Sequence, residues 1–177
     1  MTFVSRPWDG FRAQRNFALR AAKNDWVLVH DGDEKCTSEL RDKITQLINQ
    51  RGGPPHLAYK VRRIEYFLGR EIHHGIWNPS YHDRFFNRQG VEYVREIHEF
   101  PSFKSEPGRI EEPILHWPGF GPERFLDKMN RYTTLEARSF VMAGRRTNFA
   151  RMLLAFPRMF FRNYFKHRAY KDGFHGF

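Results

Sequence analysis

A short apolar run that ends in two closely spaced acids constrains this chain more than any other segment. Trp26-Val-Leu-Val29 is typical of a buried β-strand, and Asp31 and Asp33 follow it directly. In α/β proteins, ligand sites lie at the carboxyl ends of strands. Carboxylate oxygens are the ligands that Mg²⁺ or Mn²⁺ prefers, and such a cation usually also contacts substrate phosphates. The spacing indicates either a divalent-metal site at Asp31 and Asp33 or an acidic turn in which Asp33 or Glu34 favours the N-terminus of the next helix.

The hydrophobic pattern of the rest of the chain predicts an α/β fold. Apolar residues recur with a helical period in two early segments and one late segment, and shorter apolar or alternating runs indicate strands. We expect helices over 9–22, from Thr37 or Ser38 to about 50, and over 121–144, with strands over 27–29 and 58–66. In the late helix the predicted inward face includes Met129, Tyr132, Phe140 and Val141. Segment 67–117 has no helical period, so we expect short strands and long loops there.

The last 33 residues differ in character from the rest. Eight Arg or Lys face a single acid in 145–177, which accounts for +7 of the net charge of +10. Phenylalanines alternate with these bases, as in helices that lie in a membrane interface. We therefore divide the chain into a domain over 1–144 and a basic, Phe-rich amphipathic tail over 145–177, which Pro157 is expected to kink or divide. The alternative is a helix that packs its Phe face on the domain and leaves its arginines in water.

The overall charge favours an anionic partner, which is a nucleotide phosphate, a nucleic acid or an anionic membrane surface. The single cysteine, Cys36, excludes an internal disulfide and fits a reducing compartment. No apolar run approaches the roughly 20 residues of a spanning helix, and the N-terminus has no apolar signal segment. These features predict a cytoplasmic protein, or one on the cytosolic face of a membrane.

Several segments together resemble family 2 glycosyltransferases, and most closely the branch of lipopolysaccharide core biosynthesis. The main matches are Arg6-Pro-Trp-Asp-Gly-Phe-Arg-Ala-Gln-Arg-Asn-Phe-Ala-Leu19 and Asp25-Trp-Val-Leu-Val-His-Asp-Gly-Asp-Glu34. Further matches are Tyr66-Phe-Leu-Gly-Arg70, His74-Gly-Ile-Trp-Asn-Pro79, Asp83-Arg-Phe-Phe86, Arg95-Glu-Ile-His-Glu99, Asn130-Arg-Tyr-Thr-Thr-Leu-Glu-Ala137, Phe160-Phe-Arg-Asn-Tyr-Phe165 and Asp172-Gly-Phe174. They follow one another in order over almost the whole chain.

The resemblance implies a partial GT-A fold, in which a Rossmann-like sheet with flanking helices binds a nucleotide-diphosphate sugar through a divalent metal at Asp31 and Asp33. The sugar would pass, with inversion, to a lipid-linked saccharide such as lipopolysaccharide core at the inner face of the cytoplasmic membrane. The metal would stabilise the leaving diphosphate. The implied base is Glu99, with Asp83 as the second candidate. The remaining implied site residues are Arg15 and Asn16 near the nucleotide, His98 beside Glu99, Arg131 near the diphosphate or acceptor, and Trp77 at the acceptor sugar.

The chain also departs from the family. Members begin with two strands that hold the nucleoside, and neither is present before Thr2-Phe-Val4, where the third strand would lie. The hypothesis that follows is a truncated glycosyltransferase without activity on its own. Two other classes compete with it. One is a basic nucleic-acid-binding protein, against which the absence of any such motif counts, so that we expect no nucleic-acid partner. The other is a non-catalytic membrane-surface protein.

Overall fold

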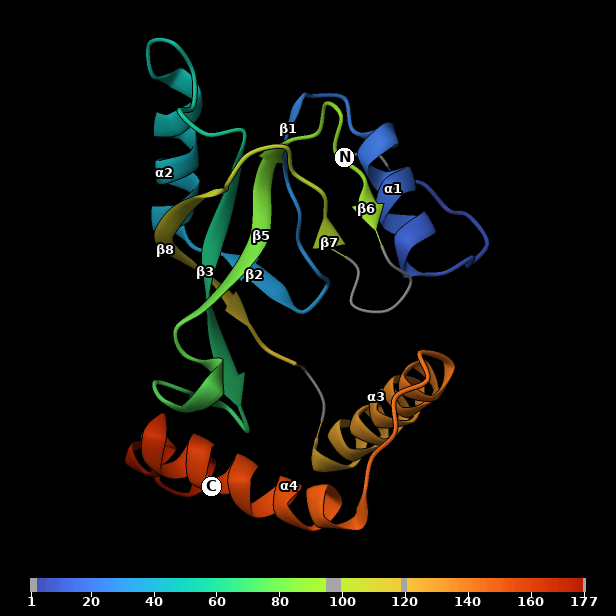
Figure 1. The fold of residues 1–177 in the computed structure, drawn as a ribbon. Helices are drawn as coiled ribbons and strands as arrows, with labels where there is room; N and C mark the ends of the chain where they lie inside the picture. The colour runs from blue at the N-terminus through green and yellow to red at the C-terminus, as the bar shows by residue number, and fades with distance from the viewer. Residues whose placement is uncertain (1–2, 95–99, 119–120, 177) are drawn as a thin grey trace. The chain divides into compact units, whose positions relative to one another are not determined.

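The computed structural model describes residues 3–94, 100–118 and 121–176, which form two compact units. The first unit contains the described residues up to Arg63 together with Tyr81–Ile114. The second contains Ile64–Ser80 and the described residues from Leu115 onward. The α/β class predicted from the sequence is confirmed (Figure 1). The GT-A architecture and the division at residue 144 stay predictions.

The strands of the described residues form one main sheet and one small pair. Five strands of the main sheet follow the order β1-β5-β3-β8-β2, and β4 pairs with β3. Their bounds are β1 Trp26–Leu28, β2 Glu34–Cys36, β3 Ala58–Phe67, β4 Arg70–Glu71, β5 Ser80–Asn87 and β8 Gly108–His116. The pair is formed by β6 (Tyr93–Val94) and β7 (Phe100–Pro101). Strand β1, which precedes the two acids, lies antiparallel to β5, so the acids emerge beside β5.

The strands predicted over 27–29 and 58–66 are confirmed, but 67–117 holds longer strands than expected. Strand β5 places Arg84, Phe85 and Phe86 in buried positions one after another, and β8 contains Glu111 and Glu112 directly before Pro113. Neither pattern alternates strictly between apolar and polar residues. The period of two that normally reveals a half-buried strand is therefore absent from both.

Two helices of the first unit were predicted correctly, and their local sequences explain why they form. Helix α1 (Phe11–Ala21) buries Leu19 and exposes Arg12 and Arg20, whereas Arg15 is partly buried. Helix α2 (Ser38–Asn49) begins after Thr37, whose Oγ1 accepts a hydrogen bond from the backbone N–H of Leu40 at 3.2 Å. The same hydroxyl donates to the carbonyl oxygen of Pro113 at 2.9 Å, which ties the start of α2 to β8. A threonine cap of this kind satisfies a backbone donor that the helix leaves free.

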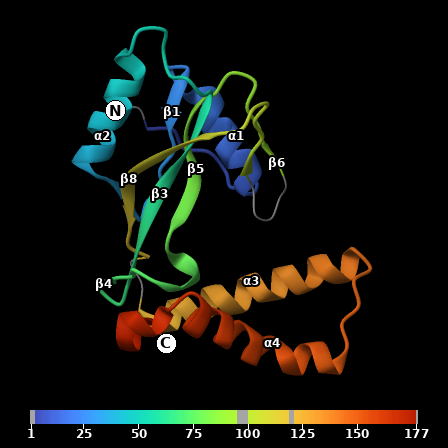
Figure 2. The same ribbon diagram turned by 60° about the vertical axis from the view of Figure 1, so that its left-hand side comes forward.

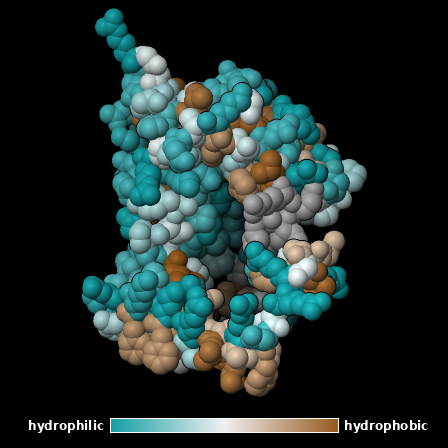
Figure 3. All heavy atoms as spheres, viewed as in Figure 1, coloured by the Kyte–Doolittle hydropathy of each residue, from teal (hydrophilic) through white to brown (hydrophobic). Residues whose placement is uncertain are grey.

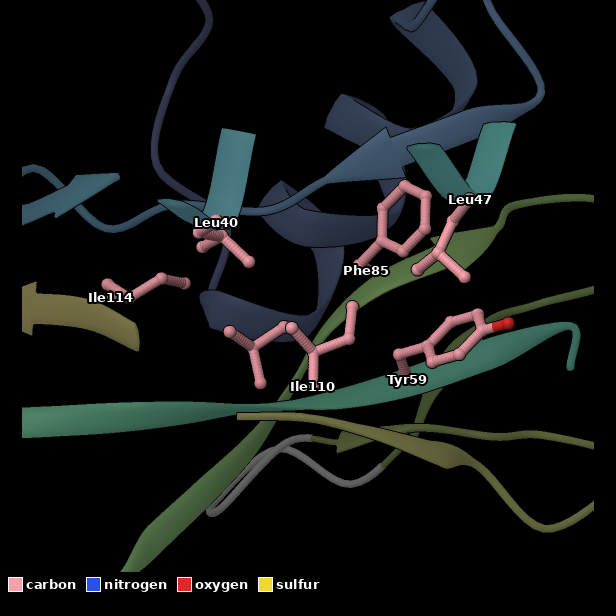
Figure 4. Packing of buried hydrophobic residues seen from close by; sticks show 7 residues of the cluster. Leu40, Leu47, Tyr59, Phe85, Ile110 and Ile114 are labelled. Carbon is pink, nitrogen blue, oxygen red and sulfur yellow. The ribbon is translucent and has the colours of Figure 1, made fainter. Parts of the chain in front are cut away.

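Two hydrophobic clusters fix strand β5. The larger joins α2 to the sheet, as Figure 4 shows, and consists of Leu40, Leu47, Tyr59, Val61, Phe85, Ile110 and Ile114. The smaller includes Leu19 of α1 and consists of Leu19, Ala58, Phe86 and Tyr93. The neighbouring side chains of Phe85 and Phe86 thus enter different clusters. Since closely packed cores resist displacement, β5 offers a rigid position for Arg84, which precedes them.

The second unit is mainly helical. Helix α3 (Pro122–Met142) leads through a short connection into α4 (Phe149–Phe161), as Figure 2 shows. A π-helical turn, η2 (Arg162–Lys166), continues α4, and the 3₁₀ turns η1 (Gly75–Trp77) and η3 (Ala169–Gly176) complete the unit. Pro157 lies inside α4 without dividing it. Across the part of the chain that the structure describes, no helix is both long and apolar enough to cross a membrane.

Both long helices of the second unit expose apolar side chains. The predicted inward face of α3 is wrong in this respect, because four of its members are exposed, namely Met129, Tyr132, Phe140 and Val141. Helix α4 exposes Phe149, Met152, Leu153, Leu154, Phe156, Met159 and Phe161. Hydrophobic residues gather along α4 in the space-filling view of Figure 3. An apolar periodicity in sequence identifies a helix face but does not say what covers it.

Candidate functional site

The turn after β1 brings two acids of the predicted metal segment together. The backbone N–H of Val29 donates to the carbonyl oxygen of Arg84 at 2.8 Å, so β1 runs beside β5 up to this point. The chain then turns, because the N–H of Glu34 donates to the carbonyl oxygen of Asp31 at 3.1 Å. In return, the N–H of Asp31 donates to Oε2 of Glu34 at 3.1 Å. The side chains of Asp31 and Glu34 consequently lie at one place in the first unit.

Three arginines from different elements surround these two acids. Arg15 of α1 contacts Asp31 Oδ1 through Nη2 at 2.8 Å, and Nη2 of Arg84 contacts Asp31 Oδ2 at 2.6 Å. Arg84 also donates to Oε1 of Glu34. Nη1 of Arg63, on β3, lies 3.4 Å from the same Oε1. We call these five residues the charge cluster: Arg15, Asp31, Glu34, Arg63 and Arg84.

Burial differs between the two acids of the charge cluster. The side chain of Glu34 is fully buried, whereas that of Asp31 is 36% exposed. Burial by itself raises the pKa of Asp31, but the charges and hydrogen bonds of Arg84 and Arg15 outweigh it and lower the pKa to about 2. Asp31 is therefore ionised at neutral pH. The accessible anionic oxygens of the charge cluster therefore belong to Asp31, whereas Oε1 of Glu34 contacts Arg63 and Arg84 and its Oε2 accepts from the backbone of Asp31.

The alternative interpretation of the acids as helix-favouring residues is wrong for Glu34. Glu34 begins β2, and α2 starts only at Ser38 with Thr37 as its cap. Asp33 is partly buried and belongs to the turn between β1 and β2. Over residues 3–94, 100–118 and 121–176, no three His, Cys, Asp or Glu side chains gather closely enough to hold a metal ion by themselves. Asp31 and Asp33 would thus need further ligands from outside the described protein groups.

The two other predicted residues of α1 and β5 have different surroundings. Asn16 donates through Nδ2 to the carbonyl oxygen of Tyr93 at 3.0 Å and accepts from the N–H of Tyr93 at 2.7 Å, which anchors α1 to β6. Asp83, next to Arg84, is partly buried and its Oδ1 has no hydrogen-bond partner among the described residues. Burial raises the pKa of Asp83, and the charges of Lys60 and Arg84 oppose that shift. Asp83 is thus a poorly solvated carboxyl group of the first unit.

The remaining predicted residues lie elsewhere. Arg131 is exposed on α3, and Trp77 ends η1, where its partly exposed ring meets the edge of Phe67 at 5.9 Å between centroids. Both belong to the second unit. His98 and Glu99 fall outside the described residues.

Sequence reasoning missed Arg63 and Arg84 and gave Glu34 a different role. One signal was available, because Arg84 directly precedes Phe85 and Phe86, and an arginine that is buried beside such residues needs an acidic partner.

Comparison with known proteins finds glycosyltransferases among the relatives of this chain. No family model matches the chain. The chain is 25% identical to an uncharacterized glycosyltransferase of Rickettsia bellii, over 98% of this chain and 63% of that protein. It is also 25% identical to the lipopolysaccharide core biosynthesis glycosyltransferase LpsC of Rhizobium meliloti, over 99% of this chain and 65% of that protein. A TPR repeat-containing protein of Synechococcus elongatus is 32% identical over 68% of the chain and 30% of its own length.

The resemblance found in the sequence is therefore confirmed: this chain is similar to glycosyltransferases, including one of lipopolysaccharide core biosynthesis. The chain spans 63% of the length of the Rickettsia bellii relative.

Proposed function

We propose that this chain provides part of a glycosyltransferase that moves a sugar, with inversion, from a nucleotide-diphosphate sugar to a lipid-linked saccharide such as lipopolysaccharide core. The observation that carries the proposal is the similarity to glycosyltransferases over nearly the whole chain, including the segment of Asp31 and Asp33. The position of Asp31 supports it, because this ionised and partly exposed carboxylate follows a strand end, where α/β proteins bind ligands.

A divalent cation, Mg²⁺ or Mn²⁺, would be held by Asp31 and Asp33 together with the donor phosphates. The donor set fits this type of ion, because Mg²⁺ is commonly bound by one or two carboxylates plus substrate phosphates. Each oxygen of Asp31 accepts one arginine hydrogen bond, and a carboxylate oxygen has a second lone pair for a metal. When bound, the cation supplies Lewis-acid stabilisation of the leaving diphosphate.

Arg15 and Arg84 are the groups of the first unit that we assign to the donor phosphates. Guanidinium groups pair with phosphates through two parallel hydrogen bonds, and Arg15 already points at Asp31. The role of Asn16 is indirect, since its amide is engaged by the backbone of Tyr93. It keeps the helix of Arg15 in place.

The acceptor hydroxyl needs a base, and Glu99 remains our first candidate with His98 as its neighbour. Asp83 is the second candidate. The pKa of Asp83 is raised and its Oδ1 has no hydrogen-bond partner among the described residues, so this carboxylate takes up a proton more readily than a solvated one does. Arg131 and Trp77 are assigned to the acceptor, where positive charge and an aromatic ring suit an anionic saccharide.

We place the protein in the cytoplasm, peripheral on the inner face of the membrane, with an anionic lipid surface as partner of α4. Exposed apolar side chains and eight basic residues of 145–177 support this.

In a flotation assay, the chain should float with vesicles that contain phosphatidylglycerol and should not float with vesicles of phosphatidylcholine alone. Combined Leu153→Ser and Phe156→Ser substitutions should weaken retention about tenfold or more, given the area of two apolar side chains. Phe3→Ser, an equally exposed Phe of the first unit, is the control. Equal flotation of both variants, or binding to single-stranded RNA instead of vesicles, would contradict this assignment.

Calorimetric titration tests the donor site. The full chain is titrated with UDP-, GDP- and ADP-sugars in turn, once in the presence of Mn²⁺ and once with a chelator in its place. We expect binding of one donor class only with Mn²⁺, lost in Asp31→Asn and kept in Asp42→Asn, which changes an exposed acid of α2. Binding that ignores both the chelator and Asp31→Asn would overturn the proposed metal site. Absence of binding with every donor is the result that the truncation hypothesis predicts.

A further inference from the structure

A buried carboxylate near the end of the second unit holds a histidine that lies 98 residues earlier in the chain. Oδ2 of Asp172 accepts hydrogen bonds from the backbone N–H groups of His73 at 3.0 Å and His74 at 2.7 Å. Oδ1 of the same carboxylate lies 3.0 Å from Nδ1 of His74. The side chain of Asp172 is 5% exposed, whereas that of His74 is 33% exposed. The imidazole is thus fixed on one side and open on the other.

The charge of Asp172 determines which nitrogen of His74 carries the proton. Burial alone would raise the pKa of Asp172, but hydrogen bonds from the side chain and backbone of His74 outweigh it, so this pKa lies below its ordinary value. An ionised carboxylate only accepts hydrogen bonds, so Nδ1 must donate to it. In the neutral imidazole Nε2 is then the acceptor. No group of the described residues forms a hydrogen bond with Nε2.

The backbone beneath His74 is fixed as well. The N–H of Gly75 donates to the carbonyl oxygen of His167 at 2.9 Å, and the N–H of Ile76 donates to Oδ1 of Asn163 at 2.9 Å. Gly75 has a φ of +85°, which favours glycine, and a Cβ there would lie 3.0 Å from Oδ1 of Asn163. The backbone of the loop is therefore held at four consecutive residues, from His73 to Ile76, and the open side of the imidazole is pre-organised.

A second histidine–carboxylate pair in the same unit is more deeply buried. His116 Nδ1 is hydrogen-bonded to Glu65 Oε2, and their side chains are 14% and 10% exposed. The His74 ring is more than twice as exposed as that of His116. Trp77, three residues after His74, presents a partly exposed aromatic ring braced by Phe67. A hydrogen-bond acceptor and an aromatic ring on one rigid loop match the hydroxyl groups and apolar C–H faces of a sugar.

We propose that His74 binds a hydroxyl group of the acceptor saccharide through Nε2, and that Asp172 is the positioning residue that fixes its tautomer and orientation. The inference rests on the proposed function, because it assigns residues to the acceptor site of that function. The expected ligand is a neutral part of the saccharide, since Nε2 accepts a hydrogen bond from a hydroxyl group.

Titration of the full chain with deacylated lipopolysaccharide core oligosaccharide, without any donor, tests the role of His74. The ¹⁵N resonance of Nε2 in His74 should shift on addition of the oligosaccharide. His74→Phe keeps a ring but removes Nε2, and should weaken binding roughly tenfold, as the loss of one hydrogen bond to an uncharged group does. His73→Phe is the matched control, because the exposed His73 side chain precedes His74 in the same loop. It should leave the affinity unchanged.

Asp172→Asn tests the positioning role by a change of tautomer. The two backbone N–H groups require the amide oxygen, so the amide N–H₂ must face Nδ1 of His74. Nδ1 then becomes the acceptor and the proton moves to Nε2, which NMR detects directly. We expect this variant to bind the oligosaccharide as weakly as His74→Phe does. If it fails to fold, which thermal melting shows, His74→Phe decides the outcome.

Three results would overturn the inference: no binding of the oligosaccharide, equal affinities of His74→Phe and His73→Phe, or a changed tautomer with unchanged affinity. The Mn²⁺-dependent donor titration is run on the same samples. Donor binding without an effect of His74 overturns only this inference. If no donor binds to the native chain, the donor site of the proposed function fails, and the oligosaccharide titration still tests His74.

Discussion

Replacing Glu34 with Gln tests whether the charge cluster supports the fold around Asp31. The Glu34 side chain is fully buried, and its partners Arg63 and Arg84 are 19% and 8% exposed. Removal of one partner from a buried ion pair costs about 3–5 kcal/mol, because a charge is left without compensation. Arg84 keeps its contact with Asp31 at 2.6 Å, which retains part of that compensation. We therefore expect a loss near the lower limit, about 3 kcal/mol in the free energy of unfolding.

Urea denaturation followed by circular dichroism measures this loss. The matched control is Asp42→Asn, which removes one charge from an exposed pair with Arg41 and should change stability by less than about 0.5 kcal/mol. The midpoint should move while the slope with urea stays constant, since the surface exposed on unfolding is unchanged. A loss for Glu34→Gln no larger than that for Asp42→Asn would refute the structural role of the charge cluster.

Three further predictions concern stability. The pKa of Asp31 is lowered from 3.8 to about 2 on folding, so its contribution is complete above about pH 4 and is lost as pH falls through 2. Because its side chain is 36% exposed, solvent screening should limit this loss to about 1 kcal/mol, measured as the difference in acid titration between the native chain and Asp31→Asn. Thr37→Ala should cost about 1 kcal/mol in urea, and Thr37→Ser, which keeps the cap oxygen, should restore most of it. Leu40→Ala should cost about 2–5 kcal/mol by the same assay, and a value under about 1 kcal/mol would contradict its place in the core.

Elements with local signals were predictable from the sequence. Helix α2 has a cap at Thr37 and buries Leu40 and Leu47, seven residues apart, on one face. Strand β1 is a short apolar run before a turn. Each of these features is decided by neighbours within a few residues, which is the range over which capping and periodicity act.

Pairings between distant residues were not predictable in this way. Arg84 lies 53 residues from Asp31 and 50 from Glu34, and Asp172 lies 98 residues from His74. Charge alone could not single them out in a chain with 30 Lys and Arg. Arg84 becomes the partner of Asp31 because of the register of β1 with β5. Asp172 becomes the partner of His74 because the end of the chain packs against the 72–77 loop.

The composition of the charge cluster bears on how a metal would bind to Asp31. Three guanidinium groups face two carboxylates there, so a bare divalent cation meets repulsion that an accompanying diphosphate would remove. On the proposed function, Mn²⁺ and the donor should accordingly strengthen each other's binding by the same factor, as thermodynamic linkage requires. The Asp-Gly-Asp segment is then better understood as half of a site, whose other half arrives with the substrate phosphates.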